Sequence, residues 1–187
     1  MKKVYLVHGW EGSPTSERWF NWLKEELKEK NIKFDALEMP NADYPRISEW
    51  VSYLNNTVKE IDEETYFVGH SIGSQAILRF LEKLPENIKI KGCIFVAGFF
   101  NLKEESYECE EDREIAKPWI ETPINLEKVK EHTINFLAIF SDDDPDVPLS
   151  DSKIFKEKLH AEIIIKNNEG HFNKTAEIKE ILDFILK

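Results

Sequence analysis

Short apolar runs alternate with longer amphipathic segments along this chain, and the two patterns predict strands and helices. Six runs rich in β-branched and aromatic residues are bounded by turn residues, as buried strands are. These predicted strands cover residues 3–7, 33–39, 65–69, 92–98, 135–141 and 162–166. Apolar residues at helical spacing between them predict helices over residues 16–30, 47–61, 72–84 and about 174–186, with a further helix capped by Ser150 or Asp151.

This alternation predicts the architecture of the chain. Strands that are each followed by a helix form a parallel sheet, and the helices cover both of its faces. Because crossovers between parallel strands are right-handed, the expected fold class is α/β. It is a three-layer, doubly wound, α/β-hydrolase-like fold with a six-stranded parallel sheet.

Residues 99–124 break the alternation, since this segment is long, acidic and contains several aromatic residues. Long excursions in compact domains are usually lids or binding loops. A solvated acidic loop explains most of the charges, but it explains Phe99, Phe100 and Trp119 less well. We therefore predict one domain over residues 1–187 with a short lid-like excursion at 99–124. Its acidic charges favour a cationic leaving group only weakly, because salt screens exposed charges.

Composition narrows the functional classes. The 187 residues suffice for one domain with a substantial core. A net charge of −11 argues against nucleic acid as a partner, because a polyanion would be repelled. No apolar run is long enough to span a membrane. The two cysteines, Cys93 and Cys109, have no metal-like spacing and need no disulfide, which is compatible with a cytoplasmic protein.

The third predicted strand runs into Gly-His-Ser-Ile-Gly at residues 69–73, which matches the G-x-S-x-G nucleophile elbow. In that motif the serine occupies a strained turn and projects its hydroxyl beyond the carboxyl edge of the sheet. Gly69 and Gly73 leave room for the neighbouring strand and helix. The alternative is a structural turn, but the position between a strand and a helix favours Ser71 as a nucleophile.

A serine needs a base, and the expected base is a histidine after the last predicted strand. His171 is the histidine in that position, although a loop histidine without a catalytic role would look the same. His132 and His160 fall in or beside amphipathic helices and are expected at the surface. His70 is interpreted as a packing or supporting residue, and His8 as a brace for a loop.

The acid should follow the fifth predicted strand, where the sequence reads FSDDDPDVP. Its candidates are Asp142, Asp143, Asp144 and Asp146. A calcium loop fits poorly, because the stretch has prolines and lacks the glycine and distal glutamate of an EF-hand. We choose Asp144, which Pro145 holds in a stiffened loop, with Asp143 in reserve. The other two are expected to face solvent and to act as capping residues.

Ser71, Asp144 and His171 occur in the chain order of α/β-hydrolases, each just past the carboxyl end of a different strand. An oxyanion hole would complete the site. One expected donor is the backbone N–H of Ile72, and the second is that of Trp10 in the loop after the first strand. A plain glycine turn is the alternative reading of that loop.

Five motifs together resemble a known family: HGW at 8–10, MP at 39–40, GHSIGS at 69–74, DDPDVP at 143–148 and GHF at 170–172. The chain is similar over nearly its whole length to the small single-domain serine hydrolases of the retinoblastoma-binding protein 9 type, which are YdeN-like, within the α/β-hydrolase superfamily. The resemblance implies a six-stranded parallel sheet without the leading antiparallel hairpin of larger relatives. It also implies the triad of Ser71, Asp144 and His171.

The expected function is hydrolysis of small esters or related acyl substrates through an acyl-enzyme on Ser71. Thioesters and amides stay open as substrates, and no metal or organic cofactor is needed. The alternative is a protein-interaction module with incidental or no catalysis, because fold does not fix function. Aromatic and apolar residues on or near the carboxyl-edge loops are expected to bind the substrate: Met39, Tyr44, Phe99, Phe100, Trp119, Val147 and Phe172.

Overall fold

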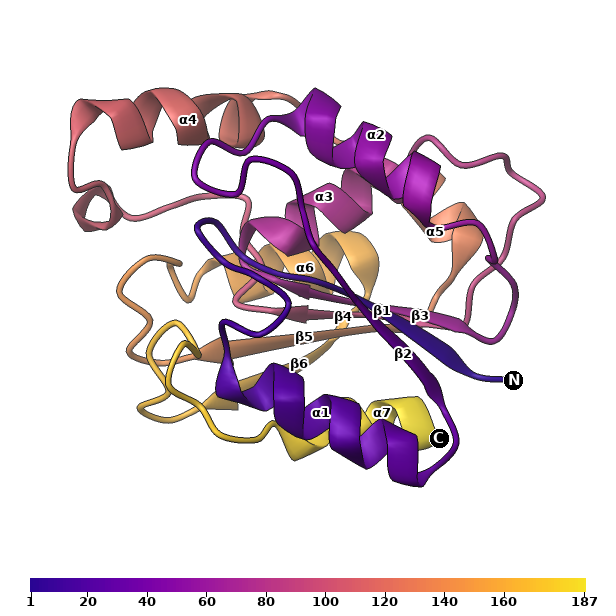
Figure 1. Cartoon of the computed structure of the whole chain (residues 1–187). Coiled ribbons are helices and arrows are strands. Elements are labelled where there is room, and N and C mark those ends of the chain that lie inside the picture. The colour runs from indigo at the N-terminus through magenta and orange to yellow at the C-terminus, as the bar shows by residue number, and fades with distance from the viewer.

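A computed structural model describes all residues from 1 to 187, and it contains one six-stranded parallel sheet (Figure 1). The strand order is β2-β1-β3-β4-β5-β6, which confirms the predicted fold class. The strands are β1 Lys3–Val7, β2 Lys33–Leu37, β3 Thr65–His70, β4 Gly92–Val96, β5 Phe136–Ser141 and β6 Glu162–Lys166.

Helices cover both faces of the sheet, as the alternating pattern predicts. They are α1 Arg18–Glu29, α2 Ile47–Thr57, α3 Ile72–Leu81, α4 Glu110–Glu121, α5 Leu126–His132, α6 Asp151–Leu159 and α7 Lys179–Leu186, with a short 3-10 helix, η1, at Glu104–Ser106. Figure 1 shows α1 and α7 together on one face of the sheet and the other helices on the opposite face. The fold therefore has three layers.

Each face of the sheet has its own hydrophobic core, because successive side chains of a strand point to opposite faces. In β3, Phe67 packs with Trp50 of α2 and Phe80 of α3 in one core. Its neighbour Val68 packs with Trp19 of α1 in the other. Both cores are needed, since a parallel sheet is stable only when both faces are covered.

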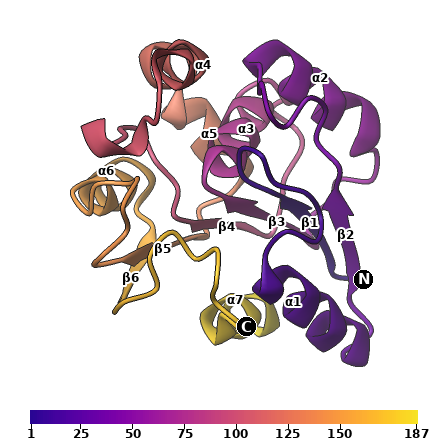
Figure 2. The ribbon, with the colours of Figure 1, turned by 60° about the vertical axis from the view of Figure 1, so that its left-hand side comes forward.

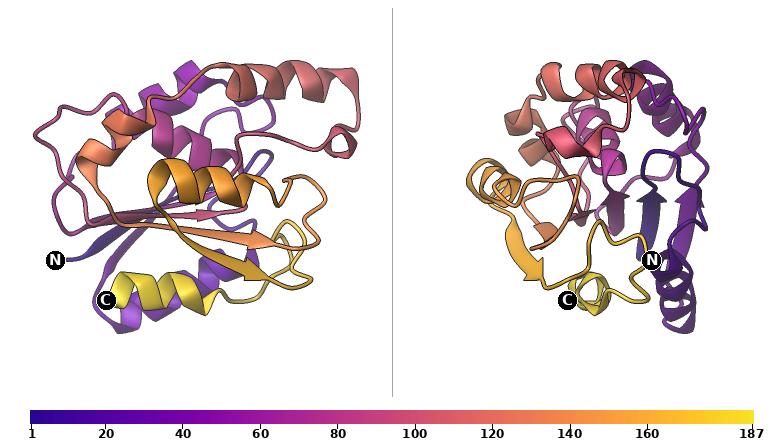
Figure 3. Two further views of the ribbon diagram at one scale, coloured as in Figure 1. Left: turned by 180° about the vertical axis from the view of Figure 1, so that it is seen from behind. Right: turned by 90° about the vertical axis from the view of Figure 1, so that its left-hand side faces the viewer.

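The 99–124 segment, expected as a lid-like excursion, contains the 3-10 helix η1 and the helix α4. Figures 2 and 3 show α4 standing on the side of the molecule where the strands reach their carboxyl ends. Trp119, near the end of α4, is buried, and its indole N–H donates to the carbonyl oxygen of Pro45 at 2.9 Å. Arg79 of α3 donates to the carbonyl oxygens of Trp119 and Thr122, each at 2.8 Å. The carboxyl end of the segment is therefore fixed to the body of the protein.

Two sequence expectations about helices need correction. The pattern did not predict α5, in which only Leu126 and Val129 supply an apolar face. His132, expected at the surface, is buried at the end of α5, where its Nδ1 lies 2.8 Å from the carbonyl oxygen of Ile88. No helix of the structure combines the length and the apolar character that crossing a lipid bilayer would require.

Candidate active site

Ser71 is the single residue between β3 and α3, and its backbone is strained. Its φ is 52° and its ψ is −123°, a region that residues other than glycine rarely occupy. A Cβ at Gly69 would lie 2.7 Å from the Cα of Ser74, and one at Gly73 would lie 2.6 Å from the carbonyl oxygen of His8. Both glycines therefore allow the sharp turn that presents Ser71 at the carboxyl edge of the sheet.

His171 lies in the loop after β6 and forms a close pair with Asp144. Its Nδ1 is 3.0 Å from each carboxylate oxygen of Asp144, whose side chain is buried. Oδ1 of Asp144 also accepts the backbone N–H groups of Asp146 at 2.8 Å and Val147 at 3.0 Å. Because a carboxylate only accepts, Nδ1 of His171 carries the proton in this pair, which leaves Nε2 free as an acceptor.

The two preceding aspartates hold the loop that carries His171. Oδ1 of Asp143 accepts from the Ser141 hydroxyl at 2.7 Å and from the Gly170 N–H at 2.8 Å. Oδ1 of Asp142 accepts the N–H of Asn168 at 2.9 Å. The expectation that Asp142 merely faces solvent and caps was incomplete, because both carboxylates join the loop after β5 to the loop after β6.

His70 supports the same loop from inside the protein. The ring is buried, and its Nε2 donates to the carbonyl oxygen of His171 at 2.9 Å. Burial lowers the pKa of His70 to about 3, so the ring is neutral at physiological pH. Trp19 and Phe20 pack edge-on against it. His70 is therefore both a packing residue and a support, as the sequence suggested.

The pKa of His171 is raised above its usual value. Burial alone would lower this pKa, but the hydrogen bond and negative charge of Asp144, together with neighbouring carboxylates, outweigh burial. The charges of Asp146 and Glu17 act in the same direction. Oδ2 of Asp146 lies 3.6 Å from Nδ1 of His171, and burial raises the pKa of Asp146 itself.

Asp144, Asp146 and His171 could also hold a metal ion, since one possible ligand atom from each lies within 4.8 Å of the others. However, Nδ1 of His171 already donates to Asp144, and Asp144 is occupied by two backbone N–H groups. These contacts suit a proton-carrying pair better than a metal centre.

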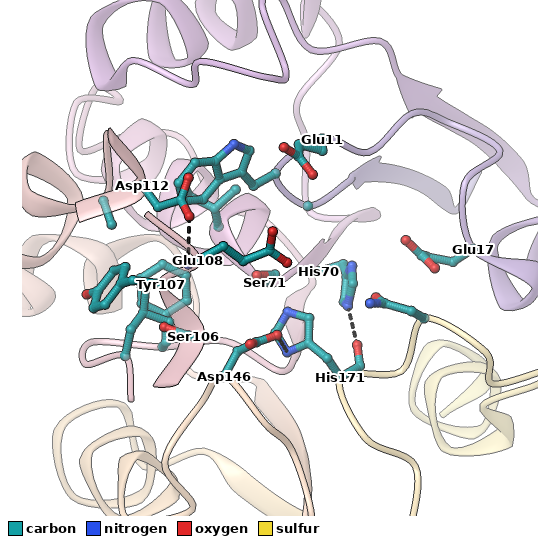
Figure 4. Close-up of a pocket in the computed structure, with 17 residues that line it drawn as sticks. Glu11, Glu17, His70, Ser71, Ser106, Tyr107, Glu108, Asp112, Asp146 and His171 are labelled. Atoms are coloured by element: carbon teal, nitrogen blue, oxygen red, sulfur yellow. Dashed lines mark hydrogen bonds and ion pairs between the residues drawn. The ribbon is translucent and has the colours of Figure 1, made fainter. Parts of the chain in front are cut away.

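Ser71 and His171 line one cavity of about 350 Å³, shown in Figure 4. The serine hydroxyl makes no hydrogen bond to Nε2 in this structure, a contact that often tightens only when substrate binds. The walls come from the loops after β1, β3, β5 and β6 and from the 99–124 segment. The cavity can thus bring a bound molecule to the hydroxyl, the imidazole and their neighbours at once.

Trp10 and Ile72, the expected oxyanion donors, line the same cavity. Ile72 begins α3, so its N–H has no acceptor within the helix. The loop before Trp10 approaches the serine closely, because a Cβ at Gly9 would lie 3.4 Å from the Cβ of Ser71. His8 braces this loop as expected, with its Nε2 accepting the N–H of Met39 at 3.1 Å.

The expected substrate-binding residues are mostly placed elsewhere. Phe99 lines the cavity, but the other six do not. Met39, Trp119, Val147 and Phe172 are core residues with at most 2% of their surface exposed, whereas Tyr44 is 54% exposed outside the cavity. Phe100 packs on Phe155 of α6, with ring centroids 5.0 Å apart. Of the seven residues, only Phe99 reaches the cavity, because the others pack inside the protein or lie at its surface.

Sequence reasoning missed the polar residues that do line the cavity. They include Glu11, Glu17, Ser106, Tyr107, Glu108, Asp112 and Asn173, and they are joined by Asp146, which was a candidate for the acid and was expected to face solvent. Four of them belong to the acidic stretch at 103–114, and that stretch was the available signal. A second feature was also missed: Asp151 fixes the start of the 99–124 segment by accepting the N–H groups of Phe100 at 2.6 Å and Asn101 at 2.8 Å.

Comparisons with known proteins agree with the resemblance seen in the sequence. The model of a family described as serine hydrolase matches residues 4–181. The protein YdeN from Bacillus subtilis (strain 168) is 34% identical over 171 residues, which cover 91% of this chain and 86% of YdeN. The serine hydrolase RBBP9 from Rattus norvegicus is 24% identical over 182 residues, covering 97% and 91%.

Solved structures agree on the fold. The crystal structure of the ydeN gene product from B. subtilis matches with a TM-score of 0.88 at 31% identity, covering 100% of both chains. Est1E from Butyrivibrio proteoclasticus, in a structure with bound ferulic acid, matches with a TM-score of 0.74 at 13% identity, covering 99% of this chain and 86% of Est1E. The second match bears on the fold alone.

Proposed function

Because the chain belongs to the serine hydrolase family, we propose that this enzyme cleaves small esters or related acyl compounds through an acyl-enzyme on Ser71. The observation that carries the proposal is one cavity that holds both a strained serine and a histidine paired with a buried carboxylate. A strained serine beside a cavity indicates a nucleophile, because a purely structural turn gains nothing from that strain.

In the proposed reaction, Nε2 of His171 takes the proton of Ser71 as Oγ attacks the carbonyl carbon. Asp144 holds Nδ1–H and stabilises the imidazolium that forms. The tetrahedral intermediate then expels the leaving group, which receives the proton from Nε2. Water attacks the remaining acyl-enzyme with His171 again as the base, and the acid product leaves with Ser71 regenerated.

The backbone N–H groups of Trp10 and Ile72 are proposed to bind the oxyanion of the tetrahedral intermediate. Both residues line the cavity beside Ser71, and Ile72 lies at the positive end of α3. One well-placed donor contributes about 3 kcal/mol to transition-state stabilisation in comparable sites. No cofactor has a part in these steps.

The 99–124 segment is proposed to act as a lid on the site of the single domain. Ser106, Tyr107 and Glu108 line the cavity, while the two ends of the segment are tied down through Asp151 and Trp119.

The two free cysteines fit a reducing compartment such as the cytoplasm.

A panel of p-nitrophenyl esters, thioesters and amides tests the proposal. We expect Ser71-dependent hydrolysis of at least one class, with loss of activity in Ser71→Ala and a sharp fall in His171→Ala. Folding of each variant is checked by thermal unfolding. Turnover that survives in Ser71→Ala would contradict the acyl-enzyme. Folded protein without turnover of any class would favour the interaction module instead.

A further inference from the structure

The cavity beside Ser71 is lined by carboxylates and by no lysine or arginine. The acidic lining residues are Glu11, Glu17, Glu108, Asp112 and Asp146. One is already engaged, because Asp112 accepts the N–H groups of Glu108 at 2.8 Å and Cys109 at 3.1 Å. Lys103 lies behind the lining, where its ammonium donates to the carbonyl oxygen of Asp144 at 2.6 Å. The ionisable side chains that line the cavity are therefore predominantly acidic.

Glu17 is a buried carboxylate, so it does not simply belong to the charged surface of the protein. Only 8% of its surface is exposed, and it forms no ion pair. It occupies the N-cap position of α1 without a capping hydrogen bond, and the neighbouring Ser16 hydroxyl donates to the carbonyl oxygen of Ser13 at 3.0 Å. Burial raises the pKa of Glu17. The nearby Ser16 hydroxyl offsets this only in part, so a largely buried carboxylate without an ion pair suits a positive group supplied from the cavity.

Glu108 faces the same space from the 99–124 segment. Figure 4 shows its carboxylate extending over Ser71 toward His70, away from the backbone that Asp112 holds. Because Glu108 is exposed, salt would screen its charge if it acted alone. Together with buried Glu17, however, it places a second negative group close to where the acyl bond would be broken.

The position of Glu17 indicates which part of a substrate it would meet. Glu17 lies on the side of the cavity that carries His70 and His171 (Figure 4). Both residues line the same cavity, and the charge of each favours the ionised form of the other. In acyl transfer the leaving group takes its proton from the histidine and therefore departs on that side. Glu17 therefore lies on the side from which the leaving group departs (Figure 4).

We propose that the natural substrates carry a positive charge in the leaving group, as esters of amino alcohols or amides of diamines do. Glu17 and Glu108 bind this charge, and the indole of Trp10 in the same lining offers a cation–π surface. This inference rests on the proposed hydrolysis at Ser71 and adds the substrate class to it.

A pair of isosteric esters tests the inference directly. One is butyrylcholine, and the other is its uncharged analogue, in which a tert-butyl group replaces the trimethylammonium group. We expect kcat/KM to favour the cationic ester by about tenfold, which corresponds to one buried charge-assisted contact. Ser71→Ala should abolish both reactions.

Charge-neutralising variants locate the effect. Glu17→Gln and Glu108→Gln should each lower the preference for butyrylcholine over its analogue by several fold. Glu111→Gln is the matched control: it removes the same charge from α4, but Glu111 is exposed and does not line the cavity. This control should keep the wild-type preference. Thermal unfolding shows whether each variant is folded.

The outcomes separate the inference from the proposed function. Equal kcat/KM for the two esters, or an equal fall in preference for Glu111→Gln, would overturn the inference while Ser71-dependent turnover still supported the function. If neither ester is hydrolysed, NMR titration of both esters into the Ser71→Ala protein tests the inference instead. Tighter binding of butyrylcholine, weakened by Glu17→Gln, supports the inference, and equal binding overturns it.

Discussion

Three consecutive aspartates perform two different tasks in this protein, and their hydrogen bonds show which residue does which. Asp142 and Asp143 accept N–H groups from the loop after β6, whereas Asp144 turns inward to His171. Asp144 is fixed in that direction by the N–H groups of Asp146 and Val147. At the residue scale, the proposed acid thus differs from its neighbours in its hydrogen bonds and not in its residue type.

The assignment predicts different effects for two neighbouring carboxylates. Asp144→Asn should lower kcat by roughly three to four orders of magnitude, because the amide leaves the imidazolium unstabilised and favours the wrong tautomer. Asp143→Asn, which keeps an acceptor for the Gly170 N–H, should have a far smaller effect. Steady-state hydrolysis of a p-nitrophenyl ester measures both. A larger loss in Asp143→Asn would reverse the assignment.

Asp146 is predicted to raise the pH above which His171 is neutral and can act as a base. A base must be neutral, so kcat/KM rises with pH through the pKa of His171, which is raised above its usual value. Asp146→Asn removes a negative charge that favours the imidazolium, and the inflection should therefore move to lower pH. A pH–rate profile of both proteins measures the shift. An unchanged inflection, or one at higher pH, would contradict the electrostatic account.

His70 is predicted to position His171, the proposed base, by a hydrogen bond to its backbone carbonyl oxygen. His70→Leu removes the donor to the carbonyl oxygen of His171, and kcat should fall about tenfold with little change in KM, because misplacing a catalytic group slows the chemical step. His70→Gln can present an N–H near the same place and should recover part of the loss. An equal loss in both variants would mean that packing alone matters.

At the scale of elements, the carboxyl end of α4 is a structural anchor. The sequence placed Trp119 in the substrate pocket, but its indole is buried against Trp50, with ring centroids 5.8 Å apart. Trp119→Ala should therefore destabilise the protein by about 3–5 kcal/mol, the range for truncating a buried aromatic residue. Urea unfolding measures the change. Unaltered stability together with altered substrate preference would instead support Trp119 as a substrate-binding residue.

Strands were easier to predict than the segments between them. Each of the six predicted strands lies within two residues of its observed bounds at either end. The four inner strands, β1, β3, β4 and β5, are buried at every position, and such strands read as short continuous apolar runs. By contrast, α2 ends at Thr57 although the apolar spacing continues to Ile61, and α7 begins at Lys179, later than the spacing suggests. Gly170, in the loop after β6, has a φ of +55°, which is the reason for glycine there, because a Cβ would meet nothing within 4 Å.

At the scale of the whole molecule, the sheet topology brings distant parts of the sequence to one place. The strand order reverses between β1 and β3, and ligands of open parallel sheets bind at such a switch point. The expected catalytic residues followed from this rule, because each comes just after a strand. The cavity walls did not, because the fold of the 99–124 segment depends on long-range contacts such as those of Arg79 and Asp151.

The central claim is that Ser71 is a nucleophile made reactive by His171 and Asp144. Covalent labelling with a fluorophosphonate probe, mapped by mass spectrometry of the digested protein, tests it most directly. We predict one adduct per chain, on Ser71, that is absent in Ser71→Ala and forms much more slowly in His171→Ala. Folded protein that stays unlabelled, or an adduct on another residue, would contradict the account.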